Sequence, residues 1–307
     1  MLKLVVMSLL ITFSISPSWA RSTSLKTSSS KSAQSKFKAQ KLAYYKRAET
    51  LSQTASSTSS NANDEKLITA TVNVSYSQSF VDRVDGNLKS SRTILAIIST
   101  KINDQWSLAT RTALSQDLRN SESLEDGFSD LLFIAGKKPS ELNDWLLGNQ
   151  SFSIIAPVSE YSTRVQNSQG SVQAAYTFAL APKVLAKGVS LSLNINASRN
   201  FHQFETDKTG AILNQYGLRE ILSAAYSIQK WTLSSDFIFR HGWNYEGSVG
   251  QSFEHSQEAA YAINPMWTVT LGHTNSGSWL APNGQDSNFK LINENDSEIY
   301  VSTSVVF

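Results

Sequence analysis

Three of the four histidines, His241, His255 and His273, recur in the last third of the chain. Histidine is the side chain best suited to acid–base chemistry near neutral pH. Beside a serine it can serve as the general base for a nucleophile. The stretch GHTNSG (272–277) places Ser276 near His273. In a strand, however, side chains three positions apart point to opposite faces, so Ser276 is poorly placed for His273. Without cysteine or a carboxylate shell, we expect no metal at these histidines.

The pairing of these histidines depends on two turns. If the 242–252 connection closes about Ser248, His241 pairs directly with His255. If the 264–266 turn closes about Pro265, His273 lies diagonal to His255. Directly paired side chains in antiparallel strands lie about 4.5–5.5 Å apart, and diagonal ones about 7–8 Å.

A second candidate set consists of charged residues that alternate with small polar ones. Its members are Arg111, Arg199, Asp236, Arg240, Glu254 and Glu258. Charges of both signs on facing walls either pair with each other or line a passage whose ion selectivity they set.

The three histidines and the six charged residues lie in segments where apolar and polar residues alternate. VSLSLNINAS (189–198) and ITATVNVSYS (68–77) alternate over about ten residues each. Such segments predict strands with one apolar and one polar face, longer than those of most soluble sandwiches. We predict twelve strands, near 67–79, 92–102, 106–116, 128–136, 150–158, 170–181, 189–200, 218–228, 231–241, 253–263, 267–274 and 297–307. The fold class is therefore all-β, an antiparallel up-and-down transmembrane barrel, in which short turns alternate with long loops.

Tryptophan opens three of these strands directly after a short turn. Trp106, Trp231 and Trp267 share parity with the apolar face of their strands. An amphipathic ring is favoured where a membrane meets water, so we expect a periplasmic aromatic girdle on the outer wall. The unequal spacing of the three residues opposes a soluble repeat protein.

The connection at 137–149, KKPSELNDWLLGN, is longer than the other short turns. Pro139 near its start, apolar residues at 142, 145 and 146, and Gly148 at its end predict a short helix. We expect the helix to lie at the interface through Trp145, which would join the girdle; the alternative is that it folds under the barrel.

The first 65 residues differ from the rest. Residues 1–20 have a Lys, an apolar run and a small-residue cleavage site, the pattern of a secretory signal peptide. Residues 21–60 hold eight basic residues and one acidic residue, although the whole chain carries only +2. The 21–65 segment is thus expected to be a Ser/Thr/Lys-rich periplasmic tail, disordered or partly helical. The barrel then occupies 66–307.

The last strand, SEIYVSTSVVF, ends in Phe307 with apolar residues at alternate positions before it. It resembles the terminal β-signal of Gram-negative outer-membrane proteins. The resemblance implies export by a cleaved signal peptide and insertion into the outer membrane by the barrel-assembly machinery, helped by periplasmic chaperones. Tyr300 and Phe307 would form part of the recognised strand.

Three functions fit such a barrel. A passive channel for small polar solutes is the first hypothesis, and a non-conducting structural or surface-display barrel is the alternative. An enzyme is the third hypothesis, because lipid hydrolases of the outer membrane keep a His and a Ser on the outer wall. GHTNSG departs from their H-x-S-N pattern, so we expect no enzyme. We expect a monomer that contacts membrane lipids and lipopolysaccharide, without cofactor or nucleic acid.

Overall fold

The computed structural model describes residues 67–79, 90–118, 127–280, 286–293 and 296–307. These residues belong to one compact unit, Lys38–Phe307. The predicted signal peptide and tail lie outside them. No helix in these ranges is long and apolar enough to cross a membrane.

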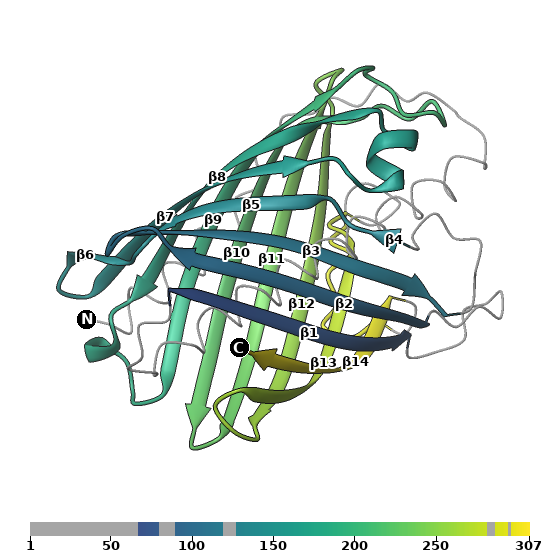
Figure 1. Cartoon of the computed structure of the whole chain (residues 1–307). Helices are drawn as coiled ribbons and strands as arrows, with labels where there is room; N and C mark the ends of the chain where they lie inside the picture. The colour runs from purple at the N-terminus through teal and green to yellow at the C-terminus, as the bar shows by residue number, and fades with distance from the viewer. Residues whose placement is uncertain (1–66, 80–89, 119–126, 281–285, 294–295) are drawn as a thin grey trace. The chain divides into compact units, whose positions relative to one another are not determined.

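Fourteen strands form one antiparallel sheet, and twelve of them close it into a barrel. The twelve are β1 (Ile68–Ser79), β2 (Ser90–Lys101), β3 (Trp106–Asp117), β5 (Leu131–Lys137), β7 (Leu146–Ala156), β8 (Ser168–Leu180), β9 (Val189–His202), β10 (Asn214–Ile228), β11 (Trp231–Asn244), β12 (Val249–Ala262), β13 (Trp267–Ser278) and β14 (Ser297–Val306). β14 pairs with β1, and β2 pairs with both β1 and β3, so the ring has no open edge (Figure 1). All twelve predicted strands are confirmed.

Alternating exposure separates the two faces of the wall. In β1, Val74 and Tyr76 are exposed, whereas Ser75 and Ser77 are buried. The same alternation holds in β14, where Val301 is exposed and Ser302 is buried. Apolar side chains thus point outward and small polar ones inward, as the sequence pattern predicts.

Asparagine fixes two of the short turns that precede a tryptophan. Asn103 Oδ1 accepts hydrogen bonds from the backbone N–H groups of Gln105 and Trp106, both at 2.9 Å. Asn264 Oδ1 accepts the same pair of bonds from Met266 and Trp267, also at 2.9 Å. A side-chain acceptor at this position closes a turn that would otherwise leave donors unpaired. Trp106, Trp231 and Trp267 are each the first residue of their strand, as predicted.

The predicted helix at 137–149 is wrong. The segment forms β6 (Ser140–Asn143), a turn at Asp144 and Trp145, and the start of β7. β6 pairs with the first residues of β7, and β5 pairs with the later ones. After a break at Lys138 and Pro139, β6 therefore takes the place of β5 as the neighbour of β7, as Figure 1 shows. Gly148 leaves room for Tyr176, whose hydroxyl would collide with an added Cβ.

Candidate functional site

Charged side chains gather on the inward face of β11 and β12. Arg240 Nη2 lies 2.5 Å from Glu254 Oε2, and the two side chains are 6% and 3% exposed. Arg219 in β10 is the register partner of Arg240. Asp236, two positions along β11 from the inward Ile238, is also buried. A buried carboxylate is tolerated when a cation and hydrogen bonds compensate its lost hydration. We call Arg219, Asp236, Arg240 and Glu254 the inward charge cluster.

Glu258 belongs to a separate inward contact. In the register of β12, β13 and β14, Glu258 lies beside Gly272 and Gly272 beside Tyr300. The Tyr300 hydroxyl donates a hydrogen bond to Glu258 Oε1 across β13. An added Cβ at Gly272 would collide with the Tyr300 ring at its Cζ atom. Glycine at this position therefore allows Tyr300 to reach Glu258.

Arg111 lies on a different wall of the barrel. Its inward side chain comes from β3, beside the inward Ala113. β3 and β11 are separated by six steps of the ring in either direction, so they face each other across the barrel. In Figure 1, β3 crosses the front of the barrel and β11 lies behind it. Arg111 thus lies opposite the wall that carries the inward charge cluster.

Arg199 does not face the lumen, contrary to the prediction. It is exposed in β9 and shares parity with the outward Ile195. Its guanidinium carbon lies 5.2 Å from the ring centroid of Phe201 and 5.7 Å from that of Tyr216. Leu193 and Arg199 are six positions apart in β9, an even number, so their side chains lie on the same face of the strand. Leu193 belongs to the apolar, outward face. The sequence alone, read by this alternation, therefore also places Arg199 on the outward face.

Sequence reasoning missed Arg219 and the inward role of Tyr300. Arg219 shares a face with Ser223 and the inward Ile221. The predicted strand 218–228 already contains Arg219, and its parity with Ser223 places it in the lumen set. Tyr300 could be assigned only to the assembly signal, because its contact with Glu258 crosses a neighbouring strand.

The predicted pairing of His241 with His255 is also wrong. His241 pairs with Gln251, and Phe237 pairs with His255. Asn244 Oδ1 accepts from the N–H groups of Glu246 and Ser248 at 3.1 and 2.7 Å and so closes a tight turn. The turn centre therefore lies at Glu246 instead of Ser248, which shifts the register of the hairpin.

The second histidine pairing is confirmed. Gln257 pairs with His273, so His273 lies diagonal to His255 on the outward face. The ring of His255 also contacts a serine that sequence reasoning did not consider. Its Nε2 lies 3.1 Å from the Oγ of Ser235 in β11.

A segment of the β13–β14 connection covers this part of the outer wall. The Phe289 ring centroid lies 5.4 Å from that of Phe237 and 5.2 Å from that of Phe253. The carbonyl of Lys290 accepts a hydrogen bond from Asn275 Nδ2. His255 and Asn275 are consequently only 6% and 1% exposed. We call Asp286–Asn293 the covering segment.

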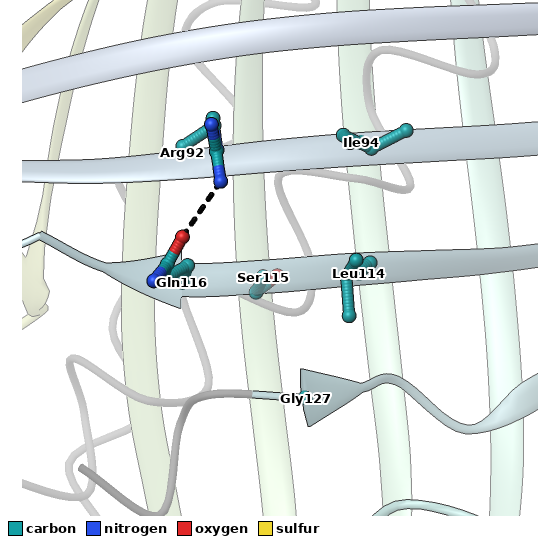
Figure 2. A pocket seen from close by; sticks show the side chains of 6 residues that line it. All are labelled: Arg92, Ile94, Leu114, Ser115, Gln116 and Gly127. Atoms are coloured by element: carbon teal, nitrogen blue, oxygen red, sulfur yellow. Dashed lines mark hydrogen bonds between the residues drawn. The ribbon is translucent and has the colours of Figure 1, made fainter. Parts of the chain in front are cut away.

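A further pocket, of about 200 Å³, lies against β2, β3 and β4 (Gly127–Phe128). Figure 2 shows Arg92 and Gln116 pointing toward each other across two strands, with Nη2 to Oε1 at 2.8 Å. Ile94 and Leu114 line it from the outward face of the wall. Within the described ranges no group of three His, Asp or Glu residues is arranged to hold a metal ion.

No protein-family model matches the sequence, and no curated protein matches it either. Solved structures do resemble the fold. An outer-membrane channel of the COG4313 group from Pseudomonas putida F1 is 13% identical, with a TM-score of 0.54, over 81% of this chain and 98% of that one. The NanC porin is 12% identical, with a TM-score of 0.51, over 78% of this chain and 98% of that one. This chain therefore has the fold of outer-membrane β-barrels.

Proposed function

We propose that this protein is a channel of the Gram-negative outer membrane that passes small polar solutes through its lumen. The observation that carries the proposal is the inward charge cluster, on a wall whose other inward side chains are small polar residues together with Ile221 and Ile238. The Arg240–Glu254 pair places a cation and an anion side by side, so the cluster favours solutes that carry both polarities or none. The structural neighbours described as a channel and a porin support the same direction.

The outward face supports a location in a membrane. Phe152, Ile154 and Val301 are each at least half exposed on it, and a soluble protein rarely exposes a continuous apolar surface of this kind. Facing lipid, these side chains need no cover. We infer that they contact membrane lipids and lipopolysaccharide, that the barrel works as a monomer, and that Trp106, Trp145, Trp231 and Trp267 form the periplasmic girdle.

Single-channel recording tests the proposal most directly. We expect purified, folded protein in a planar lipid bilayer to give discrete current steps. Folding is checked separately by the difference in migration between unheated and heated samples in gel electrophoresis. Folded protein that inserts into the bilayer but carries no current would rule out the channel and leave a structural or surface-display barrel as the function.

The orientation of the barrel gives a second prediction. The β9–β10 connection holds an exposed turn in which Asp207 Oδ1 accepts from the N–H groups of Thr209 and Ala211, both at 2.9 Å. We expect an epitope tag inserted between Thr209 and Gly210 to bind antibody on intact cells, because long loops of such barrels face outward from the cell. A tag at Asp104 should bind antibody only after the outer membrane is permeabilised. The reverse result would invert the orientation.

A further inference from the structure

The outward apolar face is interrupted halfway along β11, β12 and β13. Leu233, Val269 and Leu271 lie on it near the short turns. Above them, four polar side chains share the same outward parity: Ser235, His255, Gln257 and Asn275. Polar side chains on a face that meets hydrocarbon cost free energy unless hydrogen bonds compensate them, so a cluster of four on this face requires an explanation.

Ser235 and His255 form a nucleophile–base contact. The distance of 3.1 Å from Ser235 Oγ to His255 Nε2 is within hydrogen-bond reach. A serine hydroxyl becomes a useful nucleophile only when such a base removes its proton. For that role the ring must carry its own proton on Nδ1 and leave Nε2 free.

Asn275 is placed to hold the ring in this state. It is the direct register partner of His255. Its amide nitrogen is held by Lys290, while its Oδ1 and His255 Nδ1 are both buried without a hydrogen-bond partner among the described residues. Directly paired side chains start from Cβ atoms about 4.5–5.5 Å apart. A hydrogen bond from Nδ1–H to Oδ1 would satisfy both groups and fix the tautomer, as the acidic member does in serine hydrolases.

Gln257 supplies a donor on the open side of the site. It pairs directly with Ser235 and its side chain is exposed, whereas His255 and Asn275 lie under the covering segment. An amide N–H beside the nucleophile can stabilise the oxyanion that forms when a carbonyl is attacked. A polar cluster that only fastened the covering segment would need neither this exposed donor nor a partly exposed serine.

We propose that these four residues form an acyl-ester hydrolase site on the outer wall. Ser235 Oγ attacks the carbonyl carbon of a fatty acyl ester, and its proton passes to His255 Nε2. The ester C–O bond breaks, and the leaving alcohol takes the proton from His255. Water then attacks the acyl-serine and gives its proton to His255. Release of the fatty acid returns that proton to Ser235.

The surroundings of the site define the substrate class. The rings of Phe237, Phe253 and Phe289 form an apolar cluster beside His255, with Phe237 its direct register partner. The site opens toward the lipid that surrounds the barrel. The substrate is therefore a membrane lipid with a long acyl ester. Its acyl chain packs on the three phenylalanine rings, and its ester group reaches Ser235.

A fluorophosphonate probe tests the site on the full protein in detergent micelles. We expect covalent labelling at Ser235, found by mass spectrometry of the digested protein, and none in Ser235→Ala. Ser234→Ala is the matched control, because Ser234 points inward from the same strand, and it should label like the wild type. Folded wild-type protein that does not label at Ser235 would overturn the proposal.

Hydrolysis adds a second readout. Wild-type protein should release fatty acid from phosphatidylethanolamine vesicles or from lipopolysaccharide, and the arm that responds identifies the lipid. His255→Gln should lower the rate about 10²- to 10⁴-fold. Asn275→Ala should lower it and change its pH profile, whereas a merely structural role would leave the profile of the residual activity unchanged. Release of fatty acid from neither lipid by folded wild-type protein would exclude the activity. Conductance of Ser235→Ala should equal that of wild type, so the channel proposal stands or falls separately.

Discussion

Replacing Glu254 with Gln shifts the selectivity of the lumen toward anions. In the inward charge cluster, Glu254 lies 2.5 Å from Arg240, whose register partner is Arg219. Without the carboxylate of Glu254, two guanidinium groups face the single carboxylate of Asp236 in a confined space where charge is poorly screened. Arg240→Gln leaves two carboxylates, Glu254 and Asp236, against the single guanidinium of Arg219, and it shifts selectivity toward cations. The reversal potential of single channels in a salt gradient measures both changes, which should have opposite sign.

Two outward residues provide matched controls. Glu220 in β10 shares the outward face with Leu222, and Arg199 shares that of Ile195. Glu220→Gln and Arg199→Gln remove the same charges from the other side of the wall. Their reversal potentials should match the wild type. If the inward and outward variants shift the reversal potential equally, the net charge of the protein sets the selectivity and the inward charge cluster does not.

The barrel itself could be predicted because each strand repeats one simple requirement. Lipid outside and a polar interior impose a period of two over ten or more residues, as in VSLSLNINAS. The turns before Trp106 and Trp267 were also predictable, since Asn supplies a side-chain acceptor for the turn. These features depend only on neighbours in the chain.

The helix expected at 137–149 shows where local pattern fails. Leu142, Trp145 and Leu146 recur at helical spacing, but so short an apolar pattern does not separate a helix from two strands and a turn. Asn143 decides the outcome, because its Oδ1 accepts from the N–H of Trp145 at 3.0 Å and closes a turn. The sheet then continues past Pro139, since the start of β7 offers β6 a partner.

The candidate site on the outer wall could not be predicted for a related reason. Its assembly depends on the register of three strands, and the β11–β12 register depends on where one turn closes. Moving the turn centre from Ser248 to Glu246 replaces His241 with Phe237 as the partner of His255. Ser235 then comes within reach of His255 by a diagonal contact. Neither residue is near the other in sequence, and no motif marks the pair.

Deleting Phe307 should abolish assembly of most of the protein. Its backbone closes the seam of the barrel, with its N–H donating to the carbonyl of Ala70 at 2.8 Å and its carbonyl accepting from the N–H of Ala70 at 3.4 Å. Two such bonds contribute only about 0.5–1.5 kcal/mol each. The side chain is 54% exposed and adds little packing. A large loss of folded barrel would therefore reflect recognition before folding, as the terminal signal implies.

Two variants separate recognition from stability. Phe307→Tyr keeps an aromatic terminus and should restore normal levels of barrel in isolated outer membranes. Phe201→Ala removes another outward aromatic, from β9, and should leave those levels unchanged. The amount of protein that migrates as a folded barrel without heating measures all three. If the Phe307 deletion reaches wild-type levels, the last strand does not act as an assembly signal. If Phe201→Ala loses as much as the deletion, outward aromatic packing in general explains the effect, because the barrel then depends on such contacts wherever they occur.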